Sequence, residues 1–229
     1  MPTNRLHDSQ VATGKGDDGS TGLLFGGDRI QKDDARTEAY GTIDEAVAAL
    51  GLARAELGAL AGAGALKPGL AELADLILRF QRELFVAGAE LATNPAAWDR
   101  QVDGQTRVSE AMLEGVEDVL GEMEARIAMP REFVVPGETR TSAALEMART
   151  VLRRAERRTV AVHRDGLVPG PYLLPYLNRL ADLLWVLARA AEQAEARNAT
   201  PARVGSRPQS SRSTARRTAS GDPLRSEGA

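Results

Sequence analysis

Apolar residues in the middle of the chain recur at alternating steps of three and four positions, and this period constrains the fold strongly. The cleanest example lies between Pro68-Gly69 and Asn94-Pro95, with apolar positions at Leu70, Leu73, Ile77, Phe80, Leu84, Ala87 and Leu91. Such steps place the side chains on one face of a helix with 3.6 residues per turn. The sequence therefore predicts a long amphipathic helix over this stretch.

Four further segments carry the same helical period. One follows Asp34, one runs from about Ser109 to Ala128, one from near Thr141 or Ser142 to about Val162, and one starts at Pro175. The connections between the segments are mostly short, which favours an up-and-down bundle with antiparallel neighbours. No alternation with a period of two recurs. The predicted fold class is all-α, a five-helix up-and-down bundle, and an α/β nucleotide-binding fold is disfavoured.

The residue types that are missing exclude several kinds of site. The chain has no cysteine and only two histidines, His7 and His163. Disulfide scaffolds, thiol nucleophiles and cysteine-ligated metal centres are therefore excluded, and a multi-histidine metal cage is hard to build. No apolar run approaches the roughly 18 residues that a membrane helix needs. Because the N-terminus is polar as well, the sequence predicts a cytoplasmic protein that does not enter the membrane.

Charge is unevenly distributed along the chain, whose formal net charge is −3. Residues 201–229 contain six arginines against Asp222 and Glu227, so an acidic body precedes a basic tail. We expect three parts: a glycine-rich nucleotide-binding segment over 1–34, the bundle over 35–200, and a disordered Arg/Ser-rich tail over 201–229. The tail is interpreted as a solvated appendage. Contact of the tail with nucleic acid or an acidic partner is the alternative.

A glycine-rich segment with hydroxyl and amino groups precedes the first helix. It reads Thr13-Gly14-Lys15-Gly16-Asp17-Asp18-Gly19-Ser20-Thr21-Gly22, and Lys32 follows. Glycines let backbone N–H groups converge on an anion, so the segment suits a polyphosphate. It is not a P-loop, because Ser20 stands where that motif has lysine. A mobile polar arm is the alternative, and the two aspartates would repel phosphate unless a cation bridges them or they bind ribose or backbone.

The fourth expected helix concentrates arginines in a chain that has 26 arginines and only three lysines. Arg149, Arg153 and Glu156 stand at i, i+4 and i+7, so they share one face, which Arg157 continues. This face is either solvated or paired with an anion, such as a triphosphate or carboxylates on a neighbouring helix. On the fifth helix, Asn178 and Asp182 lie one turn apart, either exposed or hydrogen-bonded within a site.

From about Thr13 to Ala191 the sequence resembles the PduO-type ATP:cob(I)alamin (corrinoid) adenosyltransferases. The resemblance rests on five separated blocks that occur in order. They are Thr13 to Thr21, Lys32-Asp33-Asp34 with Glu38 to Glu45, Phe133 to Gly137, Ala148 to Arg157, and Tyr176 to Asp182. Any one block alone would be unremarkable, whereas five in order make a chance likeness improbable.

This resemblance implies a homotrimer whose active sites lie between adjacent subunits. The implied reaction transfers the 5′-deoxyadenosyl group of ATP to cob(I)alamin, forming adenosylcobalamin and triphosphate, with Mg2+ held chiefly by the phosphates. The implied partners are an external reductase for Co(II) and an adenosylcobalamin-dependent mutase, with no membrane and no nucleic acid. A non-enzymatic corrinoid carrier or delivery protein is one alternative, and a nucleic-acid-binding helical protein that uses the tail is another.

The resemblance also implies roles for individual residues. The residues expected around ATP are Thr13, Gly14, Lys15, Gly16, Thr21, Gly22, Lys32, Arg153, Arg154, Ala155, Glu156, Arg157 and Asn178. Arg153 is expected at the reacting groups, Arg149 would pair with Asp44 of the neighbouring subunit, Phe133 would lie against the lower face of the corrin, and Asp182 would belong to the same wall.

Two positions depart from the pattern of the family. Glu138 stands where a second glycine is frequent, and Glu146 stands where a histidine is common. Both departures concern local geometry on the corrin side, and neither bears on the reaction class.

Overall fold

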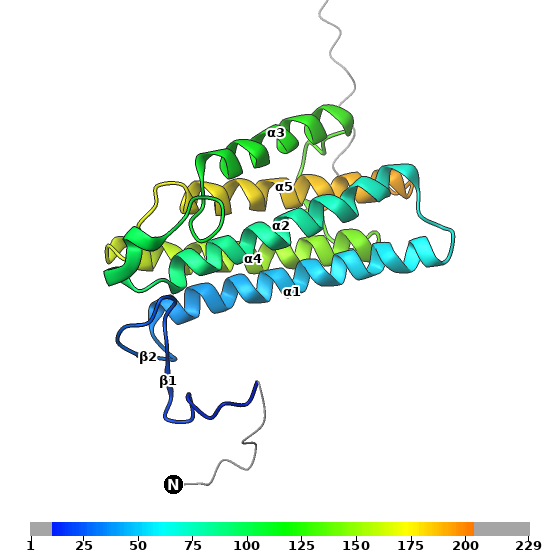
Figure 1. Cartoon of the computed structure of the whole chain (residues 1–229). Coiled ribbons are helices and arrows are strands. Elements are labelled where there is room, and N and C mark those ends of the chain that lie inside the picture. The colour runs from blue at the N-terminus through cyan, green and yellow to red at the C-terminus, as the bar shows by residue number, and fades with distance from the viewer. Residues whose placement is uncertain (1–10, 204–229) are drawn as a thin grey trace, which may run out of the picture.

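Five long helices dominate the computed structural model, which describes residues 11–203 (Figure 1). They are α1 (Ala35–Gly62), α2 (Pro68–Ala92), α3 (Glu110–Arg126), α4 (Arg140–Arg164) and α5 (Leu173–Ala194). A short 3-10 helix, η1 (Pro95–Arg100), lies between α2 and α3. The predicted all-α five-helix bundle is confirmed.

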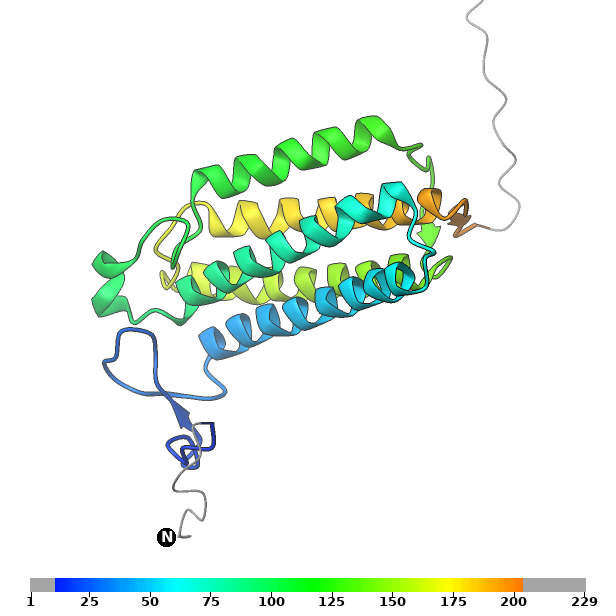
Figure 2. The same cartoon turned by 45° about the vertical axis from the view of Figure 1, so that its right-hand side comes forward.

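Helices α1, α2, α4 and α5 form a four-helix bundle, and α3 packs on the outside of it. Around the core, α1 contacts α2 and α4, while α5 contacts α4 and α2. Helix α3 packs on the outer side of α5 (Figure 1). Successive helices alternate in direction as expected, so α3 and α5 run the same way (Figure 2). Since α3 rests on α5, this one pair of neighbours is parallel, in contrast to the predicted antiparallel arrangement throughout.

The helical period becomes the core of the bundle. All seven apolar positions identified in α2 are fully buried, from Leu70 to Leu91. The apolar positions of α5 are buried in the same way at Leu177, Leu180, Leu184 and Leu187. Burying a leucine or isoleucine side chain contributes about 1.5–3 kcal/mol relative to leaving it exposed. Helix α4 is buried in the same core at Leu145, Ala148 and Leu152, so this packing fixes how α4, with the arginine face, lies against α5, with the Asn178/Asp182 pair.

Side-chain caps define where the helices begin. Asp34 accepts a hydrogen bond from the backbone N–H of Arg36 at 2.8 Å, and Ser109, where the third helix is predicted to begin, accepts one from the backbone N–H of Met112 at 3.3 Å. Thr139 caps α4 in a reciprocal capping box with Ser142. Helix α5 begins at Leu173, two residues before the predicted start at Pro175.

Four strands of two residues each sit at the two ends of the bundle (Figure 2). Strand β1 (Ser20–Thr21) pairs antiparallel with β2 (Ile30–Gln31) beside the start of α1, and β3 (Val134–Val135) pairs antiparallel with β4 (Thr200–Pro201) at the opposite end. Strands of two residues are too short to show an alternation of apolar and polar side chains, so the sequence pattern did not predict them. Residues 204–229, most of the predicted tail, lie outside the described residues. No helix among residues 11–203 has the length and apolar character needed to cross a membrane.

The buried carboxylate of Glu90 joins three parts of the fold at one end of the bundle. Glu90 is 1% exposed and accepts hydrogen bonds from the backbone N–H groups of Val108 at 2.8 Å and Gly170 at 3.1 Å. These residues lie in the connections that precede α3 and α5. Burial raises the pKa of Glu90 above its ordinary value of about 4.5, although both hydrogen bonds oppose the change.

The raised pKa of Glu90 predicts a specific pH dependence of stability. A carboxyl whose pKa is higher in the folded state contributes its full stability below its unfolded pKa and loses it as the pH rises through the folded value. We therefore expect the unfolding free energy of the natural protein, relative to that of Glu90→Gln, to fall as the pH rises above about 4.5. Urea unfolding of both proteins over this range measures the difference, and a difference that does not change with pH would contradict the assignment.

Candidate functional site

A hollow of about 610 Å³ lies where the outer faces of α4 and α5 meet the loop formed by residues 127–139. Four of the five residues predicted to be catalytic line it: Phe133, Arg149, Arg153 and Asp182. Glu146 and Trp185 complete the lining that matters for the chemistry. The structure thus brings together residues that are far apart in the sequence, such as Phe133 and Trp185.

The walls of this hollow differ in chemical character. Arg149 and Arg153 stand one turn apart on α4, and Asp182 and Trp185 stand one turn apart on α5. Phe133 projects from the loop with 88% of its surface exposed. Two guanidinium groups therefore face the same space as two aromatic rings. A ligand with a flat apolar body and an anionic group matches this arrangement.

A buried ion network supports the arginine wall from behind. Arg189, which is 1% exposed, lies in the core with Nη1 3.2 Å from Glu146 Oε1 and Nη2 2.8 Å from Glu192 Oε1. Glu146 is also buried, and its Oε2 accepts a hydrogen bond from Arg149 Nε at 2.6 Å. Two arginines and two glutamates balance in charge. Glu146 thus links the core to Arg149. Only Nε of Arg149 takes part in this hydrogen bond, and its two Nη groups do not.

Removing one charge from this network should destabilise the fold strongly. Glu146→Gln leaves the buried Arg189 without its full counter-charge, so we expect the unfolding free energy to fall by about 3 kcal/mol. The control is Glu45→Gln, because Glu45 pairs with Arg154 where both side chains are exposed to solvent. For that variant we expect a loss below about 1 kcal/mol. Equal losses for the two variants in denaturant titrations would contradict a buried network.

The polar strip continues from the hollow along α4 and α5. Asn178 Nδ2 donates a hydrogen bond to Glu156 Oε1 at 3.1 Å, and Arg179 Nη1 donates to Asn178 Oδ1 at 3.1 Å. Arg157 Nη1 donates to the carbonyl oxygen of Arg153 at 3.0 Å. Glu156 and Asn178, predicted as neighbours of a nucleotide, therefore contact each other on the same face as the hollow.

Two members of the predicted nucleotide set are engaged elsewhere. Arg154 forms an ion pair with Glu45 of α1 in the same chain. Ala155 is fully buried within the hydrophobic core. The predicted place of Ala155 in the nucleotide set therefore stays a prediction, one that its buried side chain does not support.

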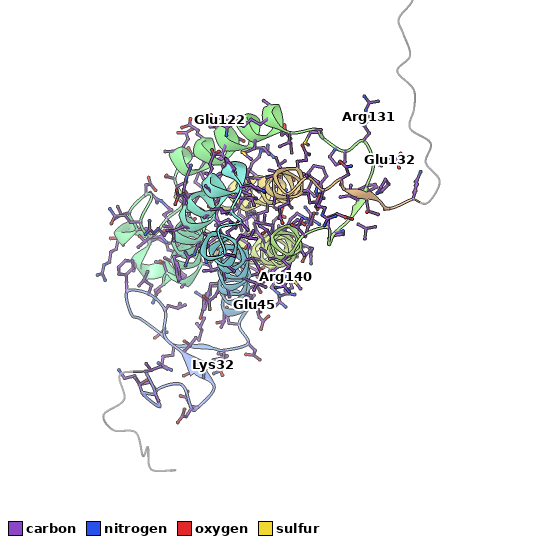
Figure 3. All side chains as sticks on the ribbon, turned by 90° about the vertical axis from the view of Figure 1, so that its right-hand side faces the viewer. Lys32, Glu45, Glu122, Arg131, Glu132 and Arg140 are labelled. Atoms are coloured by element: carbon purple, nitrogen blue, oxygen red, sulfur yellow. The ribbon has the colours of Figure 1, made fainter. Side chains whose placement is uncertain are left out.

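The glycine-rich segment forms a compact turn structure held by its own side chains. Lys32 Nζ donates to the carbonyl oxygen of Gly16 at 2.7 Å, and a Cβ at position 16 would lie 2.9 Å from that nitrogen. Arg29 donates to the Ser20 hydroxyl at 2.6 Å and to the Lys15 carbonyl at 2.7 Å. The seven predicted nucleotide-binding positions between Thr13 and Lys32 thus belong to one small unit. Figure 3 shows Lys32 on this unit, below the helices in that view.

The structure also answers what Asp18 does beside an expected phosphate. Its Oδ1 accepts hydrogen bonds from the backbone N–H of Ser20 at 2.9 Å and from the Ser20 hydroxyl at 2.7 Å. These bonds hold the pKa of Asp18 below its ordinary value. Of the roles considered from the sequence, Asp18 takes the one of binding backbone.

Contacts at one end of the bundle fix the position of the N-terminal unit. Leu24 donates its N–H to Ala92 at 2.8 Å, and Asn94 Nδ2 donates to the carbonyl oxygen of Gly26 at 2.7 Å. Arg100 lies over the ring of Phe25, 4.4 Å from its centroid. The unit is therefore attached where α2 ends, whereas the Phe133 loop lies at the opposite end of the bundle (Figure 2).

Asp44 lies apart from the other predicted catalytic residues of the same chain. It is exposed on α1 and borders a second hollow of about 370 Å³ between α1 and α2, with Tyr40 and Phe85. Viewed along the bundle, α1 and α2 form one side, while α4, α5 and the loop bearing Arg131 and Glu132 form the other (Figure 3). Within one chain, Asp44 and Arg149 thus belong to opposite faces.

Several residues of the site did not emerge from the sequence. Trp185 follows Asp182 by three positions, and this spacing could have placed it on the same face. Arg189 and Glu192 form another i, i+3 pair, but they lie in a stretch that otherwise matches a buried helix. Arg29 was one arginine among many, and only its contacts distinguish it.

Comparison with known proteins gives a consistent result. A family model described as "Cobalamin adenosyltransferase" matches residues 11–191. A corrinoid adenosyltransferase from Citrobacter freundii is 38% identical over 183 residues, covering 80% of this chain and 95% of that protein. One from Bacillus subtilis is 36% identical over 180 residues, covering 79% of this chain and 85% of that protein.

Solved structures agree with the sequence relatives. A variant PduO-type ATP:corrinoid adenosyltransferase from Lactobacillus reuteri, complexed with cobalamin and ATP, superposes with a TM-score of 0.71 at 26% sequence identity. The match covers 85% of this chain and 97% of that chain. Another variant of the Lactobacillus reuteri enzyme, complexed with ATP, gives a TM-score of 0.71 at 26% identity and covers 84% of this chain and 100% of that one.

Proposed function

Because this chain belongs to the cobalamin adenosyltransferase family, we propose that it transfers the 5′-deoxyadenosyl group of ATP to cob(I)alamin. The products are adenosylcobalamin and triphosphate. The observation that carries the proposal is the hollow in which Phe133 and Trp185 meet Arg149 and Arg153. A corrin ring is flat and largely apolar, and the triphosphate of ATP is strongly anionic, so the two substrates match the two kinds of wall.

The chemistry of this reaction fits the side chains that are present. Cobalt in the +1 state is a strong nucleophile that uses its own electron pair to form the Co–C5′ bond, while the C5′–O5′ bond breaks and triphosphate leaves with the bonding pair. No general base is required. The task of the protein is to align the two substrates and stabilise the leaving charge. Arg153 and Lys32 supply positive charge for this purpose, and Arg149 holds the wall in place through Glu146.

Phe133 suits a second task, which is to make the cobalt reducible. An apolar ring against the lower corrin face would exclude water and the dimethylbenzimidazole base from the axial position. A four-coordinate state favours reduction from Co(II) to Co(I). The electron would come from an external reductase, and an adenosylcobalamin-dependent mutase would receive the product.

Mg2+ would most simply be carried by the substrate. Residues 11–203 contain no group of three or more His, Cys, Asp or Glu side chains arranged to hold a metal ion. Mg2+ is often bound through substrate phosphates and one or two carboxylates. We therefore propose that triphosphate oxygens supply most of its ligands here.

The complete site is proposed to form between two subunits. The nucleotide-binding unit lies at one end of its own bundle, and Asp44 lies on the face opposite to Arg149. If the α1 side of one subunit packs against the α4–α5 side of the next, Asp44 meets Arg149 and the glycine-rich unit approaches Arg153. Such a head-to-tail contact closes into a ring, and we propose a ring of three subunits.

Loss of Arg153 should abolish transfer without loss of the fold. Removing one donor that stabilises developing negative charge costs about a hundredfold or more in rate. We expect Arg153→Ala to reduce formation of the light-sensitive Co–C product by at least this factor, with ATP, Mg2+ and chemically reduced cobalamin supplied. The matched control is Arg126→Ala, because Arg126 pairs with Glu72 and Glu122 on the exposed surface. Full activity of Arg153→Ala would contradict the proposed function.

Mixed oligomers test whether the site is shared. Lys32→Ala and Arg153→Ala should each be inactive alone, but subunits mixed in equal amounts should recover about one quarter of the natural activity, since that fraction of interfaces joins two intact halves. Mixing Arg149→Ala with Arg153→Ala is the control. Both changes lie on the same face of α4, so no interface is complete and no recovery is expected. Absence of recovery in the first mixture would place the whole site within one chain.

A further inference from the structure

Phe133 is not held in place by burial of its own side chain. The ring is 88% exposed, so burial of its apolar surface contributes little to holding it in one orientation. The loop of residues 127–139 that carries it also contains two exposed apolar side chains, Met129 and Val135. Whatever fixes the direction of the Phe133 ring must therefore act through the backbone of this loop.

The backbone of the loop is bonded to β4 and to Ala202, the residue that follows β4. Ala202 donates its N–H to the carbonyl oxygen of Phe133 at 2.7 Å, and β3 pairs with β4 with Val134 opposite Pro201 and Val135 opposite Thr200. Hydrogen-bonded and non-hydrogen-bonded pairs alternate in antiparallel strands. Since Phe133 and Ala202 form a bonded pair, Pro201 falls in a non-bonded position, where its missing N–H costs nothing.

Both ends of the loop are held by the same part of the chain. The side-chain amide of Gln193 accepts from the N–H of Ala128 at 2.9 Å and donates to its carbonyl oxygen at 2.8 Å. At the other end, the hydroxyl of Thr200 donates to the carboxylate of Glu138. Gln193, Thr200 and Ala202 all follow residue 191, where the match to the family model ends.

The strand also lies beside the site itself. Ala202 and Arg203 line a further hollow of about 360 Å³ together with Arg131, Glu132 and Phe133. The last three residues also line the larger hollow that holds Arg149 and Arg153. The loop thus borders two hollows. Arg149 and Arg153 line one of them, and Ala202 and Arg203, which follow β4, line the other.

We propose that β4, through the bond from Ala202 to Phe133, is a positioning element that sets the direction of the Phe133 ring toward the corrinoid. The inference rests on the proposed function and extends it to a segment outside the family match. Gln193 and Thr200 fix the two ends of the loop, and Ala202 fixes the residue that bears the ring. Loss of the strand weakens binding of the corrinoid and leaves binding of ATP unchanged, because the bonds that hold the loop involve no residue proposed to bind ATP.

The test uses the full-length chain with Ala202→Pro, which removes the N–H donor, and with Ala202→Ser, which keeps it. One backbone hydrogen bond contributes about 1 kcal/mol, so we expect the KM for cob(I)alamin to rise about fivefold in Ala202→Pro. The KM for ATP should change less than about twofold. In the presence of ATP, the spectroscopic signal of four-coordinate cob(II)alamin should weaken in the same variant. Ala202→Ser should match the natural protein in all three measurements.

A double-variant comparison separates positioning from general support of the fold. If β4 acts through Phe133, adding Ala202→Pro to Phe133→Ala causes no further rise in the KM for the corrinoid, because coupled residues are not additive. Additive effects, or an equal change in the KM for ATP, would overturn the inference. Should Ala202→Pro fail to fold, Thr200→Val, which removes the bond to Glu138, takes its place. We then expect the KM for cob(I)alamin to rise in Thr200→Val and to rise no further when Thr200→Val is added to Phe133→Ala.

The outcomes for the inference and for the proposed function are distinct. If the natural protein forms no adenosylcobalamin from ATP and cob(I)alamin, the proposed function fails. If the natural protein is active but Ala202→Pro and Ala202→Ser have the same KM for cob(I)alamin, the role of β4 is refuted and the proposed function stands.

Discussion

The charge of Arg189 must be balanced inside the protein, and this requirement couples the core to the site. A guanidinium group withdrawn from water needs an opposite charge and hydrogen-bond partners close by. Glu192 supplies an opposite charge and a hydrogen bond, Glu146 supplies a second opposite charge, and Glu146 in turn holds Arg149 at the rim of the hollow. The direction of a surface arginine is thus determined by a residue that is 1% exposed. The glutamate at position 146, which departs from the histidine common in the family, has a clear physical role in this chain.

If the site is shared between subunits, as proposed, the arrangement of the helices explains why a single chain holds only part of it. The four-helix core has two broad outer sides, and the arginine wall occupies one while Asp44 occupies the other. The glycine-rich unit is attached by Leu24 and Asn94 at the end of α2. In the proposed assembly, each side of a subunit carries one half of a site. Head-to-tail association would then complete one site at each contact between subunits.

The two ends of the bundle hold different parts of the proposed site, and each part has its own supporting contacts. At one end, Lys32 and Arg29 shape the glycine-rich unit by bonding to backbone oxygens, which prepares it for phosphate groups. At the other end, the loop that bears Phe133 depends on Gln193 and β4 for its position. The two supports share no residue.

The sequence alone determined the helices and the composition of the arginine wall. The steps of three and four from Leu70 to Leu91 reflect helix geometry, which depends only on local spacing, and the same geometry put Arg149 and Arg153 on one face of α4. Tertiary structure decided what lies far apart in the chain: the contact of Arg189 with Glu146, the pairing of β3 with β4, the meeting of Phe133 with Asp182 and Trp185, and the separation of Asp44 from Arg149. These contacts depend on how whole helices pack and on which segments the loops bring together. The spacing of residues along the sequence does not encode either of them.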